Sequence, residues 1–346
     1  MTGKKKKKSR SGLLPALLLG VLLGLAGDAW LQLNAPLEIS HADTVELENG
    51  QRLSSLSRQM DERGLFTSER QRLYLLAYAR VHGEAALLKA GEYAIDPGLT
   101  PLGLLATLTS GKTLLHELRI VEGWRFAQAW KLIQADPNLT HTLAGADPAA
   151  IMQAIGKPGV NAEGRFFPDT YRFPKRTTDV AFLRNAYAAM DKVVTAEWDA
   201  RAPELSYKSP DQALIMASLV EKETGAPNER PIIAGVFLRR LQIGMRLQTD
   251  PAVIYGLGDA YAGNIHTEDL RTDTPYNTYT RDGLPPTPIC LPGREAIRAA
   301  LHPDEGKALY FVARGDGSHQ FSDNLEDHNA AVMRYQINKP HLHPSP

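Results

Sequence analysis

Two acidic side chains directly follow an apolar helical run, an arrangement suited to acid–base chemistry. The run Ala213–Val220 is apolar on nearly every face and continues into Glu221, Lys222 and Glu223. A carboxylate in the last turn of a buried helix lies at the negative end of the helix dipole, in a medium of low dielectric, and both effects raise its pKa. A neighbouring carboxylate adds to the rise, whereas Lys222 opposes it if it pairs with either acid. A carboxyl group protonated near neutral pH can act as a general acid.

Helix geometry does not choose between the two acids. Glu221 and Glu223 are two positions apart, which is roughly 200° around an α-helix. The two side chains therefore cannot enter one cleft from that helix. For either acid the alternative is a partly exposed residue at the end of a helix.

The ends of this helix are marked by residues that start and stop helices. Ser209 at the N-cap, Pro210 at the first helical position and Gln212 three residues after the cap predict its beginning. Gly225 and Pro227 predict its end.

Downstream polar residues are candidates for binding a substrate or supporting the acid. Asp250 precedes Pro251, so we expect its neighbourhood to be a loop or extended segment; alternatively, Asp250 caps a helix that begins at Pro251. The tyrosines offer flat apolar faces and polar tips, or they pack in the core. His319 is a candidate contact but has no partner at metal-ligand spacing, so we do not expect it to bind a metal. The candidates besides the two glutamates are Gln248, Thr249, Asp250, Tyr255, Tyr276, Asn277, Tyr279 and His319.

The charge distribution argues against a nucleic-acid-binding protein. The 346 residues carry 39 basic and 39 acidic side chains. Six of the basic residues, Lys4–Lys8 and Arg10, lie within the first ten positions. The rest of the chain is therefore net acidic and has no extended basic surface for phosphates.

The basic cluster leads into an apolar segment that predicts a membrane anchor. Residues 13–33 are long enough to cross a bilayer, for which about 20 residues suffice, with Asp28 and Trp30 near the far interface. Basic residues favour the cytoplasmic side, so we expect the rest of the chain outside the inner membrane. A signal peptide cleaved within Ala26–Ala29 is the alternative.

The remaining chain predicts an α+β protein with two further parts. Residues 1–12 form a cytoplasmic basic tail, 34–45 a linker, 46–140 a small α+β module and 141–346 a larger mixed α/β catalytic domain. In the module, short strand candidates at Thr44–Leu47 and Leu115–Val121 alternate with helical runs after Gly50, Gly98 and Gly123. These segments resemble LysM-like modules, which recognise glycan chains; a spacer domain is the alternative. Cys290, the single cysteine, cannot form an intramolecular disulfide.

Several long motifs in one order resemble a known family. They are Ala217–Thr224, Glu229–Phe237, Gly244–Pro251, Val253–Gly256, Thr274–Tyr279, Gly283–Pro286 and Gly317–Phe321, preceded by Lys89–Tyr93 and Phe167–Tyr171. Together they are similar to the endolytic murein transglycosylases, the YceG-like family. Ala252 and the pair Cys290–Leu291 depart from the family pattern.

The resemblance implies a peptidoglycan lytic transglycosylase, a carbon–oxygen lyase. It implies that the first Glu of Val-Glu-Lys-Glu-Thr, here Glu221, is catalytic, with Glu223 supporting. The enzyme would cut the bond between N-acetylmuramic acid and N-acetylglucosamine in nascent strands, leave 1,6-anhydro ends and end strand growth. The partners would be glycan strands, the inner membrane and, as a candidate, peptidoglycan synthases. A glycoside hydrolase that uses Asp250 as nucleophile or base, and a non-catalytic cell-wall scaffold, are the alternatives.

Overall fold

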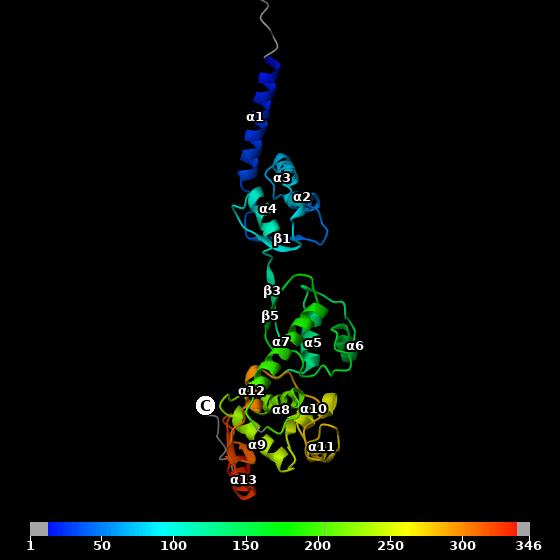
Figure 1. Cartoon of the computed structure of the whole chain (residues 1–346), viewed down its shortest axis with the longest axis vertical. Coiled ribbons are helices and arrows are strands. Elements are labelled where there is room, and N and C mark those ends of the chain that lie inside the picture. The colour runs from blue at the N-terminus through cyan, green and yellow to red at the C-terminus, as the bar shows by residue number, and fades with distance from the viewer. Residues whose placement is uncertain (1–12, 204, 338–346) are drawn as a thin grey trace, which may run out of the picture. The chain divides into compact units, whose positions relative to one another are not determined.

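The computed structural model describes residues 13–203 and 205–337 of the chain (Figure 1). The predicted basic tail, residues 1–12, lies outside the described residues. The chain divides into two compact units, Met1–His116 and Glu117–Pro346. Helices and short strands alternate in both units, and the prediction of an α+β protein is therefore confirmed.

The first unit is built around one antiparallel pair of strands. Its elements are α1 (Leu13–Asn34), β1 (Asp43–Leu47), α2 (Leu53–Glu62), α3 (Glu69–Val81), the 3-10 turn η2 (Glu84–Ala86), β2 (Gly91–Ile95) and α4 (Pro101–Ser110). In the pair, Val45 of β1 lies opposite Tyr93 of β2. The helices place leucines such as Leu56, Leu75 and Leu104 against these strands to form one core. The strand expected at Thr44–Leu47 and the helical runs after Gly50 and Gly98 are present.

Helix α1 changes its surroundings along its length. Residues 15–27 are exposed and apolar. From Asp28 onward the helix belongs to the folded unit, because the Asp28 carboxylate accepts hydrogen bonds from Tyr74 Oη at 2.9 Å and from Arg70 Nη1 at 3.3 Å. Pro15–Asn34 is the one stretch of the described residues that is long and apolar enough to cross a membrane, and a signal sequence would pass the same test.

Residues 34–45 are packed against the first unit, although the sequence analysis expected a linker there. Leu37 and Ile39 are buried in the core of that unit, and the side-chain amide of Gln71 donates to the carbonyl of Ala35. The sequence analysis did not identify Leu37 and Ile39 as buried residues, because single apolar residues in a polar stretch form no periodic pattern.

The second unit consists mainly of helices, together with several two-stranded sheets. Strand β3 (Leu115–Arg119) begins at the boundary and pairs with β5. The further elements are α5 (Phe126–Ala135), β4 (Leu139–Thr140), α6 (Pro148–Ala154), β5 (Thr170–Pro174), β6 (Thr177–Thr178), α7 (Asp179–Asp199), α8 (Pro210–Glu223), α9 (Arg230–Gln242), α10 (Asp250–Leu257), η3 (Gly258–Ala260), α11 (Thr267–Arg271), α12 (Arg294–Leu301), β7 (Tyr310–Ala313), β8 (His319–Ser322), α13 (Leu325–Val332) and the π-helical turn η4 (Met333–Ile337).

The division between the units falls at His116 and Glu117, whereas the sequence analysis expected it at residues 140 and 141. The apolar residues of this stretch explain the difference. Ile120, Phe126 and Ile133 are buried in one core with Phe166 and Phe182, which follow much later in the chain. Long-range packing of this kind leaves no mark in local sequence patterns.

Helix α8 forms the centre of the second unit. Every residue from Ala213 to Val220 is buried, and the helix packs against α7, α9, α10 and α12. Ser209 caps its beginning by accepting the Gln212 N–H, as the sequence predicts. The Gln212 side chain accepts the Lys208 N–H and not that of the cap residue, so the expected reciprocal capping box is not formed. Thr224 ends the helix in an extended conformation, which releases the chain immediately after Glu223.

Candidate functional site

A cavity of about 530 Å³ opens at the end of α8. Its walls come from the last residue of α8, from α9, from the segment before α10, from the β7–β8 hairpin and from α13. The predicted site residues that line it are Glu223, Gln248, Asp250, Tyr279 and His319. The structure therefore brings together half of the residues that the sequence analysis selected.

Glu223 is the acid of this cavity, and its environment favours the protonated form. The pKa of Glu223 is raised to about 7, mainly because the side chain is buried, and the nearby Asp250 carboxylate contributes to the rise. The Thr249 hydroxyl donates to Glu223 Oε1 at 2.5 Å and, like the more distant charge of His319, lowers the pKa. Burial disfavours the charged carboxylate more strongly than these contacts stabilise it. A carboxyl group with a pKa near 7 is half protonated at neutral pH and suits a general acid.

Thr249 is held in place by a second threonine. The buried Thr249 backbone N–H donates to Thr278 Oγ1 at 2.9 Å, and the Thr278 hydroxyl donates back to the Thr249 carbonyl. The preceding Gln248 has a φ of 50°, a left-handed conformation that is uncommon for residues other than glycine. Such backbone strain often accompanies functional sites, and here it carries an exposed polar side chain to the cavity wall.

Asp250 and Tyr279 form a hydrogen-bonded pair on the cavity wall. Tyr279 Oη donates to Asp250 Oδ1 at 2.5 Å. Burial, and then this bond to a carboxylate, raise the pKa of the Tyr279 hydroxyl. Asp250 is the first residue of α10, and its side chain faces the tyrosine and does not cap the helix.

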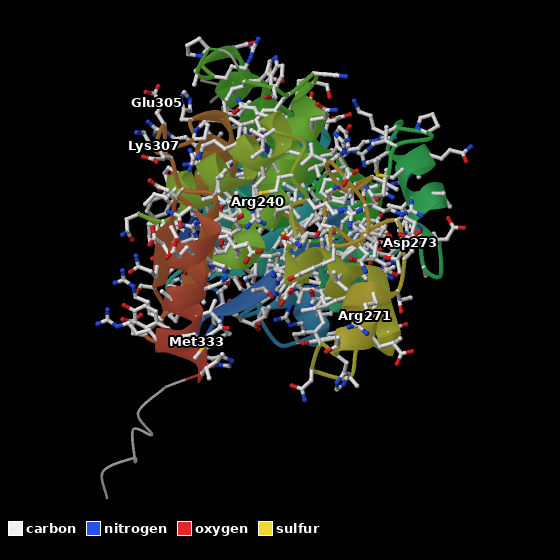
Figure 2. The ribbon with its side chains drawn as sticks, turned by 90° about the horizontal axis from the view of Figure 1, so that it is seen from below. Arg240, Arg271, Asp273, Glu305, Lys307 and Met333 are labelled. Carbon is white, nitrogen blue, oxygen red and sulfur yellow. The ribbon has the colours of Figure 1, made fainter. Side chains whose placement is uncertain are left out.

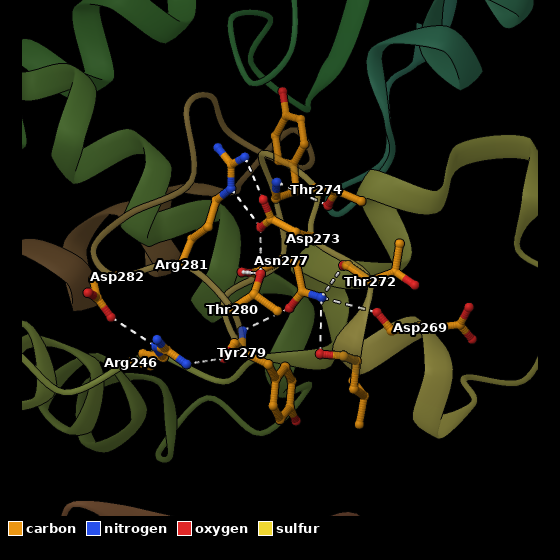
Figure 3. A network of polar contacts seen from close by, with 12 residues as sticks. Arg246, Asp269, Thr272, Asp273, Thr274, Asn277, Tyr279, Thr280, Arg281 and Asp282 are labelled. Carbon is orange, nitrogen blue, oxygen red and sulfur yellow. Dashed lines mark hydrogen bonds and ion pairs between the residues drawn. The ribbon is translucent and has the colours of Figure 1, made fainter.

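Asn277 supports the site from inside the protein and does not reach the cavity. Its side chain is fully buried, and its amide nitrogen donates to the carbonyls of Asp269, Leu270 and Thr272, while its amide oxygen accepts the Tyr279 N–H (Figure 3). These four bonds fix the loop that ends at Tyr279. Asn277 is thus a structural partner of the cavity wall and has no polar atom free for a sugar.

An outer layer of ion pairs stabilises the same loop. Arg281 pairs with Asp273, and Arg246 joins Asp282 to the Tyr279 carbonyl (Figure 3). Both pairs are largely exposed, so their contribution to the folding free energy is small.

Glu221 points to a different part of the second unit. Its Oε2 accepts the N–H of Gly293, the residue that caps the beginning of α12, at 3.0 Å. Burial raises the pKa of Glu221, the Gly293 bond lowers it, and the nearby Glu122 carboxylate raises it. Glu221 is absent from the lining of the Glu223 cavity. The side chain thus joins the end of α8 to the start of α12, where the helix dipole favours a negative charge.

A glycine makes this junction possible. A Cβ atom on Gly293 would lie 2.1 Å from Glu122 Oε1, so a larger residue would force the carboxylate away. Glu122 and Glu221 therefore both approach the first turn of α12.

Tyr255 and Tyr276 pack against each other beside a third buried acid. Their ring centroids are 4.8 Å apart, and Tyr255 Oη donates to Glu163 Oε2 at 3.2 Å. Burial outweighs the hydrogen bonds from the Phe126 N–H and the Tyr255 hydroxyl, so the pKa of Glu163 is raised to about 7. Neither tyrosine lines the Glu223 cavity. The structure thus separates these two candidates from Tyr279.

Arg240, Glu229 and Glu163 were missed by the sequence analysis. Arg240, labelled in Figure 2, is 7% exposed and donates to the carbonyls of Leu309 and Leu247. Glu229 is 5% exposed and holds His319. The sequence signal that could have revealed Arg240 is a charged residue inside the otherwise apolar run of α9, because a charge in such a run is seldom buried without a partner.

Cys290 is a packed residue of the core. Its side chain is fully buried, and the thiol donates to the Ser218 carbonyl at 3.4 Å. Burial raises the pKa of the thiol well above its usual value. A buried, protonated thiol is a poor nucleophile.

The family model of the YceG-like family matches residues 45–334. The chain belongs to the YceG-like family. The match spans both units and includes every residue of the Glu223 cavity that we discuss.

Named relatives agree with this assignment. The chain is 30% identical over 325 residues to an endolytic murein transglycosylase of Bacillus subtilis, and the match covers 88% of each chain. It is 29% identical to one of Streptococcus pneumoniae, where the match covers 86% of this chain and 59% of the relative. The structure of a putative YceG-like protein from Listeria monocytogenes superposes with a TM-score of 0.53 at 29% identity, covering 84% of this chain and 98% of that chain.

The first prediction concerns the Thr249 hydroxyl. A hydrogen bond to a charged group contributes about 1.5–3 kcal/mol, and one pKa unit corresponds to about 1.4 kcal/mol. Thr249→Val removes a donor that stabilises the ionised Glu223, so the pKa of Glu223 should rise from about 7 by about one to two pH units. Carbon-13 NMR of labelled glutamate carboxyl groups measures the change. Thr195→Val, at an exposed position of α7, is the control. An unchanged Glu223 titration in Thr249→Val would contradict the role of the Thr249 hydroxyl as the donor that stabilises the Glu223 carboxylate.

Proposed function

We propose that this protein is a peptidoglycan lytic transglycosylase. The observation that carries the proposal is an acid with a pKa of about 7 in a cavity of about 530 Å³ that also presents an amide, a phenol and an imidazole. Such polar tips suit the hydroxyl and acetamido groups of a sugar chain. Relatives that match most of the chain are named endolytic murein transglycosylases, which supports the same substrate class.

In the proposed reaction, Glu223 donates its proton to the glycosidic oxygen between N-acetylmuramic acid and N-acetylglucosamine. The bond from that oxygen to the anomeric carbon breaks, and the N-acetylglucosamine part leaves as an alcohol. The C6 hydroxyl of the muramoyl residue attacks the anomeric carbon and loses its proton, which closes a 1,6-anhydro ring. In the simplest scheme the Glu223 carboxylate accepts that proton and is ready for another turnover. The scheme needs no cofactor because the substrate supplies the nucleophile.

We propose Glu223 as the acid, whereas the sequence analysis expected Glu221. Three observations support the change. Glu223 lines the cavity together with Gln248, Asp250 and Tyr279, and its pKa is raised to about 7. Glu221 lies outside that lining, and its carboxylate is engaged by the N–H of Gly293. The helix turns the two acids to different sides, so one serves the cavity and the other the contact with α12.

The second prediction uses the two glutamates as matched controls. Glu223→Gln cannot donate a proton and should lower the cleavage rate about 10²–10⁴-fold, the usual contribution of a general acid. Glu221→Gln keeps an oxygen that accepts the Gly293 N–H, so we expect it to retain most activity. The assay is digestion of purified peptidoglycan with mass spectrometry of the products, in which anhydro ends are one water lighter than reducing ends.

Each failure of this experiment has a distinct meaning. An inactive Glu221→Gln with an active Glu223→Gln would return the catalytic role to Glu221. Reducing ends without anhydro products would favour a hydrolase, in which Asp250, on the same cavity wall as Glu223, would activate water. Release of terminal disaccharides alone would contradict an endolytic enzyme. Full activity in both variants would leave a binding scaffold as the better explanation.

We further propose that the first unit is a LysM-like glycan-binding module. A second cavity, of about 830 Å³, is lined by the turn between β1 and α2, by α3 and by the segment before β2. Asn49, Gln51, Arg52 and Arg80 bring polar groups to a wall that also contains leucines. This mixture of apolar surface and hydrogen-bonding tips suits a polysaccharide.

The third prediction tests this module. The double variant Asn49→Ala, Arg80→Ala removes two polar groups from the wall and should reduce retention on insoluble peptidoglycan several-fold, measured by co-sedimentation. The rate on short soluble glycans should be unchanged. Arg58→Ala, exposed on α2 and outside the cavity lining, is the control. Equal retention of the variant and the parent protein would favour a spacer.

We propose that α1 is a retained single-pass anchor of the inner membrane, with both units on the outer side of that membrane. Asp28 accepts hydrogen bonds from Tyr74 and Arg70 of α3. Cleavage within Ala26–Ala29 would either remove Asp28 from the folded unit or leave it at a new, exposed N-terminus. The last turns of α1 are therefore part of a folded unit, which favours retention over cleavage. An anchored enzyme of this orientation can reach strands near their site of synthesis and end their growth, with peptidoglycan synthases as candidate partners.

The fourth prediction concerns this topology. Protease added to intact spheroplasts should digest both units and leave a short membrane-bound fragment that contains α1. A cytoplasmic protein in the same cells should survive until lysis. Digestion only after lysis would contradict the orientation, and release of both units into the medium without protease would indicate a cleaved signal.

A further inference from the structure

The uncharged part of α1 is too short to cross a bilayer before the helix reaches the folded unit. The helix begins at Leu13, and Asp28 is its first charged residue. The fifteen residues from Leu13 to Gly27 rise about 22 Å, whereas the hydrocarbon core of a bilayer is about 30 Å thick. Basic residues end at Arg10 and favour the cytoplasmic edge for the start of α1. In an anchored protein, Asp28 and the turn after it therefore lie where the hydrocarbon meets the outer headgroups.

Helix α3 reaches the same depth, because it packs beside this part of α1 (Figure 1). The Asp28 carboxylate accepts hydrogen bonds from Tyr74 and Arg70. One turn later, the carbonyl of Gln32 accepts the side-chain amide of Gln71 at 3.2 Å. A charged carboxylate near the end of a membrane span is costly unless it is paired. The two donors that pair with Asp28 are side chains of α3, so α3 accompanies α1 to the level of the headgroups.

The same contacts determine which side of α3 faces the membrane. Arg70 and Tyr74 contact Asp28, which lies deeper in the membrane than the contact one turn later. Leu73, Ala77 and Val81 follow at spacings of three and four residues, so they share that side of the helix. All three are exposed, Leu73 to 49% and Val81 to 81%. We call Leu73, Ala77 and Val81 the lipid face of α3.

The residues around the lipid face suit a layer of lipid headgroups. Trp30 of α1 is 66% exposed, and Tyr74 and Tyr78 of α3 are half-buried. Aromatic side chains with a polar tip are enriched where a membrane meets water. The largely exposed Arg70 can cover apolar surface with its stem and keep its guanidinium among the headgroups. A single exposed apolar residue is common on water-facing helices, but these residues gather at the depth that α1 assigns to the bilayer surface.

We propose that the lipid face of α3 inserts into the outer headgroup layer of the bilayer that α1 crosses, so that the first unit rests on the membrane. This inference rests on the retained anchor that we propose above. The occupant of the face is lipid because α1 fixes the depth of α3 and lipid surrounds every part of α1 that protein does not cover. Shallow insertion of apolar side chains is how amphipathic helices bind membrane surfaces.

The proposed glycan cavity of the first unit lies on a different side of α3. Leu76 lines that cavity, and it is roughly 140° around the helix from Val81. One helix thus contributes a lipid face on one side and part of a cavity wall on another.

The fifth prediction places spin labels on the full-length protein in vesicles of phosphatidylcholine and phosphatidylglycerol. Leu73→Cys and Val81→Cys each carry a nitroxide, and electron paramagnetic resonance measures its collisions with oxygen, which concentrates in lipid, and with a water-soluble nickel chelate. We expect the oxygen-to-nickel collision ratio at both positions to be several-fold higher than at Leu115→Cys. Leu115 is the matched control, because it is 54% exposed but lies in β3, where the chain leaves the unit (Figure 1). Cys290 is fully buried and should not react, which the unsubstituted protein checks.

A further label separates this inference from the proposed anchor. Leu22→Cys places it at an exposed position in the apolar part of α1. A lipid-like ratio at Leu22 with water-like ratios at Leu73 and Val81 would overturn the inference and leave the anchor standing. A water-like ratio at Leu22 would overturn the anchor as well. Protection of the Leu73 and Val81 labels from both reagents would mean that protein covers the face, which also overturns the inference. Both positions are exposed, and either one decides the outcome if the other variant does not fold.

Discussion

The site depends on the burial of α8. Because every residue from Ala213 to Val220 is enclosed, the helix cannot rotate or shift without opening the core of the second unit. Its final turn is therefore fixed, and with it the directions of Glu221 and Glu223. One acid contacts the first turn of α12 and the other faces a cavity. The packing of a single apolar helix thus directs two carboxylates, two positions apart, into different surroundings.

The cavity balances opposing influences on one proton. Burial and Asp250 favour neutral Glu223, whereas the Thr249 hydroxyl and His319 favour its anion. Burial has the larger effect, and the resulting pKa of about 7 lets the group give and regain a proton under the same conditions. Thr278 and Asn277 contribute indirectly, because they fix the segments that carry Thr249 and Tyr279. Several residues around the site therefore serve to hold in position the few side chains that line the cavity.

Local sequence patterns predicted several helices and strands well, but they predicted only in part which residues lie together in space. The beginning of α8 at Ser209 and the strand near Val45 follow from short-range rules of capping and alternation, which the sequence displays directly. The 200° between Glu221 and Glu223 was also predictable, but the location of the cavity was not, because its walls come from β7, β8 and α13, far along the chain. Asn277 looked like a sugar ligand since sequence does not reveal that backbone carbonyls use its amide.

The contact between Asp28 of α1 and Tyr74 of α3 has a mechanical consequence. A helix that ends inside a folded unit cannot swivel independently of it, in contrast to one joined through a loose tether. In the anchored protein that we propose, any change in the tilt of α1, such as a thicker or thinner lipid bilayer would impose, is therefore transmitted as a rotation of the first unit. Bilayer thickness would thereby influence the angle between this unit and the membrane.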